Sequence, residues 1–148
     1  MALKLQTYVL DSALETIQQK AKTVRDTAVT IKTQIDAGPV PSDVVINLMR
    51  HMRIAHDVMS AAKAMPGLNE YAKNEFNDPL LDYVAEVNTA LSAMLACYTW
   101  VNTNFPKDAS GYLLKDKIVN GVIENRIFTQ AQTAGLSTAL ATLIAAFG

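Results

Sequence analysis

Apolar residues recur at alternating steps of three and four along three stretches of this chain, a spacing that forms one apolar stripe on an α-helix. The mean step of about 3.5 residues favours helices that pack side by side at shallow crossing angles. The stripe positions are Leu10, Leu14, Ile17, Ala21, Val24, Ala28, Ile31 and Ile35, then Val45, Leu48, Met52, Ala55, Met59 and Ala62, then Leu80, Val84, Val87, Leu91, Met94, Tyr98, Val101 and Phe105. The pattern predicts a mainly helical protein, an antiparallel bundle of three long helices.

Glycine, proline and capping residues set the expected bounds of the first two helices. The first helix is expected from Leu3 to Asp36, where Gly38 and Pro39 end it. The second is expected to begin at Ser42, whose hydroxyl suits an N-cap, and to run to Ala64 or Met65.

The third long helix is expected to begin at Asp78-Pro79, because an Asp cap followed by proline in the first turn is a common helix start. It should end near Asn104, since the residue before Pro106 is driven out of the helical region. A short helix is expected before it, from Leu68 to Phe76.

The segment 112–128 departs from the helical period. Asn120-Gly121 lies between two apolar runs, and this pair suits the positive φ angles of a two-residue type I′ turn. The predicted β-hairpin pairs Val119 with Val122, Ile118 with Ile123, and Lys117 with Glu124, which carry opposite charges. A continuous helix is the alternative, because Gly121 costs only about 1 kcal/mol in a helix.

A last helix is expected after the hairpin. Thr129 and Gln132 have the spacing of a capping box, in which each side chain accepts from the other residue's backbone amide. The apolar stripe that would pack on the bundle consists of Leu136, Leu140, Leu143 and Phe147. Ala131, Gly135 and Ala139 form a smooth face for close approach of another helix.

Composition adds an expectation about assembly. A chain of 148 residues has the usual size of one domain, so a single helical-bundle domain spanning 1–148 is expected. Half of the residues are apolar and 18% are charged, against a usual charged share of about 25%. A long bundle exposes much surface, so we expect part of this apolar excess to pack on another chain, as in a homo-oligomer or a larger assembly.

Charge and hydropathy argue against two classes of partner. The formal net charge is −1 and no basic run occurs, whereas direct nucleic-acid binding needs a concentrated basic face. The most apolar segment, Ala134–Phe147, is too short to span a bilayer, and the first ten residues do not resemble a secretory signal. Neither nucleic acid nor a membrane is expected as a direct partner.

No catalytic, cofactor or metal constellation stands out in the sequence. His51 and His56 are five residues apart and point about 140° apart on a helix, so they cannot share a metal. Asp11 and Glu15 are one turn apart but lie on a polar face, where both should be solvated. Cys97 lies close to the apolar stripe and is expected to be a buried hydrophobe. No catalytic residue, cofactor or metal ligand is predicted.

The candidate functional residues are therefore those of an interaction surface. Trp100 falls beside the main stripe, where it either flanks the core or anchors a partner. The hairpin would protrude and add its strands to a partner's sheet. The predicted interface residues are Trp100, Tyr112, Val119, Asn120, Gly121 and Val122.

The runs Ile118–Ile123 and Phe128–Leu136 resemble small proteins encoded among the structural genes of tailed bacteriophages. The resemblance covers about a fifth of the chain and carries no matched functional residue. It implies a virion component, such as a head-tail connector, adaptor or minor capsid protein, present as one copy in a ring or lattice. Without this resemblance, a cytoplasmic location would be expected.

These observations favour a non-enzymatic structural or interaction protein whose hairpin or apolar helix face docks on neighbouring subunits. The alternative is a small helical binding or regulatory module that holds an apolar ligand or a protein partner. A cavity of several hundred Å³ lined by Met52, Met59 and Met94 would favour this alternative.

Overall fold

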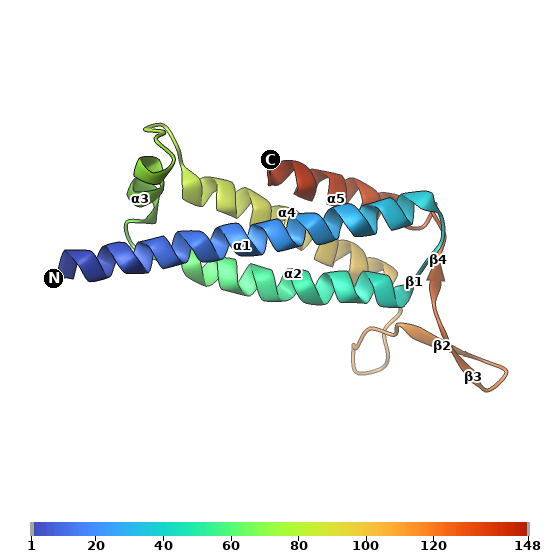
Figure 1. The fold of residues 1–148 in the computed structure, drawn as a ribbon. Helices are drawn as coiled ribbons and strands as arrows, with labels where there is room; N and C mark the ends of the chain where they lie inside the picture. Colours follow the sequence, from blue (N-terminus) through green and yellow to red (C-terminus); the bar gives the residue numbers. More distant parts are fainter. Residues whose placement is uncertain (1, 148) are drawn as a thin grey trace.

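Four long helices form an up-down-up-down bundle in the computed structural model, which describes residues 2–147, with side chains from Val9 onward (Figure 1). The four are α1 (Ala2–Ala37), α2 (Ser42–Lys63), α4 (Tyr83–Asn104) and α5 (Ala134–Ala146). Around the bundle α1 contacts α2, α2 contacts α4, α4 contacts α5, and α5 returns to α1. The short helix α3 (Leu68–Glu75) lies across one end, near the bounds predicted for it.

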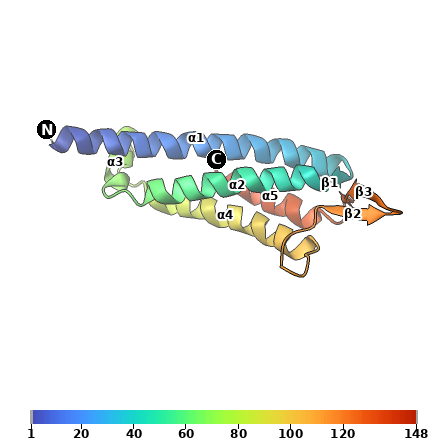
Figure 2. The ribbon, with the colours of Figure 1, turned by 90° about the horizontal axis from the view of Figure 1, so that it is seen from below.

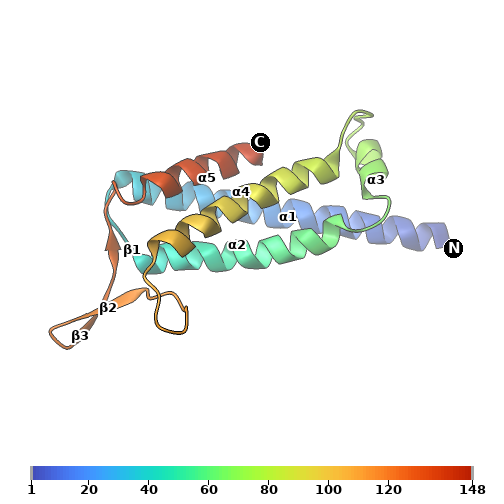
Figure 3. The ribbon, with the colours of Figure 1, turned by 180° about the vertical axis from the view of Figure 1, so that it is seen from behind.

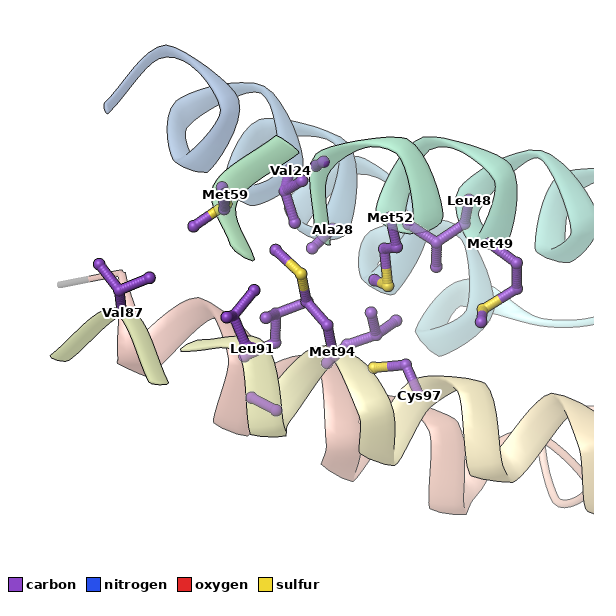
Figure 4. Packing of buried hydrophobic residues seen from close by; sticks show 14 of the residues in the cluster. Val24, Ala28, Leu48, Met49, Met52, Met59, Val87, Leu91, Met94 and Cys97 are labelled. Atoms are coloured by element: carbon purple, nitrogen blue, oxygen red, sulfur yellow. The ribbon is translucent and has the colours of Figure 1, made fainter. Parts of the chain in front are cut away.

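The predicted stripes form the core. Residues from α1, α2 and α4 point toward one another in the bundle interior (Figure 4). The members of the stripes that are buried are Leu10, Leu14, Ile17, Val24, Ala28, Ile35, Val45, Leu48, Met52, Ala55, Met59, Val87, Leu91, Met94, Val101 and Phe105. The predicted antiparallel bundle with a hairpin before the last helix is confirmed.

The predicted start of the third long helix is wrong. Helix α4 begins at Tyr83, and its cap is Asp82, whose side chain accepts a hydrogen bond of 3.1 Å from the amide of Ala85. Asp78-Pro79 instead opens a tight turn, because Asp followed by proline suits the first two positions of a β-turn as well as a helix start. Leu80, predicted on the buried stripe, lies in this turn and is 92% exposed.

The N-cap role predicted for Ser42 is also wrong. The Ser42 hydroxyl does not accept from a helix amide but points to the hairpin, where the Lys115 carbonyl and Asn125 Oδ1 are its acceptors. Asn125 Oδ1 accepts instead from the amide of Asp43, over 3.3 Å, in the first turn of α2. Asn125 therefore caps the N-terminal end of α2 although it lies more than eighty positions away in the sequence. No local sequence pattern reveals such a cap.

Two small antiparallel sheets lie at the end of the bundle opposite α3 (Figure 1). Strands β2 (Asp116–Val119) and β3 (Val122–Asn125) form the predicted hairpin in the predicted register. Asn120 and Gly121 have φ angles of 51° and 79°, as a type I′ turn requires, so the continuous-helix alternative is wrong. The second sheet, β1 (Val40–Pro41) with β4 (Ile127–Phe128), was not predicted.

Helix α5 closes the bundle against α1 and α4 (Figure 3). The predicted capping box is confirmed: the amide of Gln132 donates to the Thr129 hydroxyl, and the amide of Thr129 donates to Gln132 Oε1. The box precedes one turn that leads into the regular helix at Ala134. Gly135 lies against Trp100, where a Cβ would be 3.2 Å from the indole ring.

Candidate functional site

The hairpin β2–β3 gathers four exposed large apolar side chains on one short ribbon. It projects beyond the helix ends (Figure 2) and runs at an angle to the bundle (Figure 1). Ile118 is 74% exposed and Ile123 is 72% exposed, and the two pair across the strands. Val119 and Val122 are exposed on the opposite face of the hairpin. Neither face of this ribbon is covered by the described part of the chain.

Hydrogen-bonded and non-hydrogen-bonded residue pairs alternate along the hairpin, and this places the backbone N–H and C=O groups of some residues on its outer edges. The amide of Arg126 donates to the Lys115 carbonyl over 3.0 Å, which makes this the hydrogen-bonded pair at the hairpin base. Hydrogen-bonded and non-hydrogen-bonded pairs alternate in antiparallel ladders, so Ile118 and Ile123 form a non-hydrogen-bonded pair. Their N–H and C=O groups therefore face the outer edges of the ribbon, where another strand can bind.

The base of the hairpin is fixed to the start of α2 by a polar cluster, which we call the hairpin anchor. It consists of Ser42, Asp43, Lys115, Asn125 and Arg126. The amide of Ser42 donates to the Arg126 carbonyl over 2.7 Å, and Asn125 Nδ2 donates to Asp43 Oδ2 over 2.8 Å. Lys115 Nζ donates to Asp43 Oδ1 over 3.0 Å. Strand and helix are thereby joined through backbone and side chains together.

Burial and charge both strengthen the attachment of the hairpin to α2. Ser42 is fully buried, so its hydroxyl depends on its hairpin acceptors, because an unpaired buried hydroxyl is costly. The hydrogen bond from Lys115, and then that from Asn125, holds the pKa of Asp43 below its ordinary value. The same contact with Asp43, followed by that with Asp116, raises the pKa of Lys115. The anchor therefore favours the charged forms of Asp43 and Lys115.

The predicted interface residues lie in three different places. Val119, Asn120, Gly121 and Val122 form the exposed tip of the hairpin. Tyr112 is also exposed, in the loop between α4 and β2.

Trp100 is not part of the hairpin surface. Its ring meets that of Phe128 edge-on at a centroid distance of 5.7 Å, and its indole covers Gly135. It is half-buried and packs on the core, so it flanks the core and ties β4 and α5 to α4.

Sequence reasoning missed the hairpin anchor and did not single out Ile118 and Ile123 as interface residues. The isoleucines could have been found, because the predicted register already places them together on one face of a ribbon. The anchor could not, since Ser42 and Asp43 are about eighty residues from Asn125 and carry only a helix-start signal.

The side chains with possible chemistry are dispersed. His51 is exposed and His56 is partly buried, with its Nδ1 3.6 Å from Asp57. Asp11 and Glu15 are both exposed as expected.

Tyr71 and Cys97 have raised pKa values. The Tyr71 hydroxyl donates to Asp11 over 2.8 Å, a bond that raises the pKa of Tyr71 to about 12. Burial raises the pKa of Cys97 to about 12, which keeps its thiol protonated.

The predicted methionines are packed in the core. Met52, Met59 and Met94 are all buried (Figure 4). A surface groove of about 350 Å³ between α1, α4 and the end of α5 includes Met59 but neither of the other two. The groove is therefore not the cavity lined by Met52, Met59 and Met94 that would favour an apolar-ligand module.

The described part of the chain also bears on metals and membranes. Within residues 2–147, no three or more His, Cys, Asp and Glu side chains gather in a group able to hold a metal ion. None of the helices in the same range combines the length and apolar character that crossing a bilayer requires.

Comparison with known proteins assigns no family. No family model matches the sequence, no curated protein is detectably similar to it, and no solved structure matches it.

Proposed function

We propose that this protein is a non-enzymatic structural or interaction protein, a subunit of a larger assembly that docks through its β2–β3 hairpin. The observation that carries the proposal is the hairpin itself, whose exposed Ile118 and Ile123 are held away from the bundle by the hairpin anchor. An apolar ribbon with free edges suits strand addition to a partner sheet. A virion component, such as a phage connector, adaptor or minor capsid protein, is the assembly role proposed from the sequence resemblance.

The fixed base supports docking rather than a loose surface loop. A flexible hairpin would lose conformational entropy on binding, which weakens association. Here the base is ordered in the free chain by hydrogen bonds to α2, so less freedom remains to be lost. The exposed apolar side chains are consequently presented in a defined orientation.

Gradient sedimentation of extracts from the native source tests the proposal. The wild-type protein should sediment with a particle far heavier than its 16.1 kDa chain. The variant Ile118→Ser/Ile123→Ser should remain in the light fractions, because it removes the apolar row but keeps the turn and the anchor. A control, Ile54→Ser on α2, removes an isoleucine that is 59% exposed outside the hairpin and should sediment like the wild type. A wild-type protein found wholly as a monomer, or a hairpin variant that still sediments with the particle, contradicts the proposal.

A further inference from the structure

A second exposed apolar surface lies at the end of the molecule opposite the hairpin. The segment 75–82, here called the acidic loop, consists of the last residue of α3 and the connection to α4. It carries Glu75, Asp78 and Asp82 and no Lys or Arg. Leu80 in this loop is the most exposed large apolar side chain among the described residues, and Phe76 is 44% exposed. The loop therefore combines negative charge with uncovered apolar surface.

The acidic loop has a defined shape. The amide of Leu80 donates to Asp78 Oδ1 over 3.1 Å, and the amide of Leu81 donates to the Asp78 carbonyl over 3.2 Å. Phe76 stacks on Tyr83 at a centroid distance of 5.8 Å. Leu80 is thus directed into solvent by an ordered turn.

A groove of complementary character runs between α2 and α4. Its volume is about 510 Å³, within the range of roughly 300–1,000 Å³ typical of binding pockets. Arg50 and Arg53 from α2 line it, together with the apolar Leu95 of α4 and Leu113 of the following loop. Leu95 is 50% exposed. We call this surface the arginine groove.

The chain itself balances only part of the positive charge of the arginine groove. Neither Arg50 nor Arg53 forms an ion pair within 4.0 Å among the side chains described from Val9 to Phe147. Arg50 contributes to the low pKa of Asp43 only as the last and smallest cause. Asp57 also lines the groove, so two arginines and one aspartate leave it one net positive charge.

We propose that the arginine groove of one copy binds the acidic loop of a second copy. Leu80 and Phe76 would cover Leu95 and Leu113, while Glu75 and Asp78 would face Arg50 and Arg53. Opposite charges on the two surfaces and exposed apolar side chains on both support this pairing.

The two surfaces cannot meet within one chain. The acidic loop precedes α4, whereas Leu113 follows it, and the 22 residues of α4 span about 33 Å. Because each copy carries both surfaces, the contact forms a ring or a filament when it repeats head-to-tail and a two-fold dimer when it is reciprocal. The contact patch is small, so self-association should be weak, dependent on concentration, and reduced by salt.

This inference deepens the proposed assembly role by naming a second copy as one partner, but it does not need the hairpin to bind. Sedimentation velocity of the purified full chain over a concentration series tests it. The wild-type mean mass should rise with concentration, and the rise should be smaller at about 1 M salt, where charges are screened beyond about 3 Å.

Two variants and their mixture identify the contact. The groove variant Arg50→Glu/Arg53→Glu and the loop variant Glu75→Gln/Leu80→Ser should each remain monomeric. An equimolar mixture of the two should form a dimer and nothing larger, because one intact groove and one intact loop remain. The control Lys20→Glu/Lys22→Glu makes the same charge change on α1 and should associate like the wild type.

Four results would overturn the inference: a monomeric wild type at every concentration, a groove variant that associates normally, a mixture that stays monomeric, or loss of self-association in Ile118→Ser/Ile123→Ser. The last result would assign self-association to the hairpin and leave the proposed function standing. Conversely, a hairpin variant that self-associates but leaves the native particle supports both proposals separately.

Discussion

The bundle and the hairpin use the same kinds of apolar residue in opposite ways. Ile17 and Ile35 of α1 are almost fully buried, whereas Ile118 and Ile123 of the hairpin are about three-quarters exposed. Full burial of such a side chain contributes roughly 1.5–3 kcal/mol, so the bundle isoleucines stabilise the fold and the hairpin isoleucines do so only slightly. Apolar surface that does not stabilise the free chain remains available to stabilise a complex.

The two regions also differ in how they are held together. The bundle depends on apolar packing among its helices, whereas the hairpin is attached through the polar anchor at the start of α2. The stability of the fold and the exposure of the hairpin to a partner therefore depend on different residues. Substitutions in the core should change the free energy of unfolding, and substitutions in the hairpin should change docking.

The largest expected effect is on the bundle side. Leu140→Ala removes a fully buried side chain from α5 and should lower the free energy of unfolding by about 2–5 kcal/mol. Ile123→Ala, at an exposed position, should change it by no more than about 0.5 kcal/mol. Urea denaturation followed by circular dichroism measures both. Similar losses in the two variants would mean that the hairpin isoleucine is part of the folding core.

The next effect is at the anchor. Asn125→Ala removes the cap on the Asp43 amide and the partner of the Asp43 carboxylate, so it should cost about 1–2 kcal/mol. Sedimentation with the native particle should weaken although Ile118 and Ile123 are unchanged. The exposed Asn74→Ala on α3 serves as the matched amide control. Docking that is unaffected by Asn125→Ala would show that a fixed base is unnecessary.

An effect of similar size, but more local, is expected at the turn. Gly121→Val places a β-branched residue at a φ of 79°, where the left-handed conformation costs roughly 1–2 kcal/mol. The amides of β2 and β3 should exchange faster with solvent while those of the bundle keep their protection. A uniform loss of protection over the helices would contradict the independence of hairpin and bundle.

The smallest effect concerns pH. The pKa of Asp43 is lowered in the folded chain, so its contribution is fully present above its ordinary value near 3.8 and is lost as the pH falls through the lower folded value. NMR signals of Lys115 and Asn125 should therefore move together in this acidic range. The variant Asp43→Asn should abolish their common titration, and its persistence in that variant would assign it to another carboxylate.

The elements that were predicted correctly are those specified by short-range patterns. The three-four spacing identified the stripes of α1 and α2, Asn120-Gly121 identified the hairpin and its register, and Thr129 with Gln132 identified the cap before α5. In each case the deciding interactions lie within one helix face or one turn.

The failures have physical causes that local patterns do not contain. Asp78-Pro79 suits a β-turn as well as a helix start. It forms the turn, and Asp82 caps α4 instead. Ser42 faces a distant acceptor, so tertiary contact replaced its local capping role. The two-residue strands β1 and β4 pair only because the hairpin base is brought to α2. The hairpin tip was predicted as a site, but its attachment was not.

Hydrogen exchange of the free protein and of the protein within its native assembly tests the central claim most directly. In the free chain the amides of Ile118 and Ile123 face the open edges of the ribbon and should exchange quickly. Within the assembly, at least one of the two should exchange tenfold or more slowly, while the α1 core amides change little. Protein that is demonstrably bound, yet exchanges at both amides as rapidly as the free chain, would contradict docking through the hairpin edge.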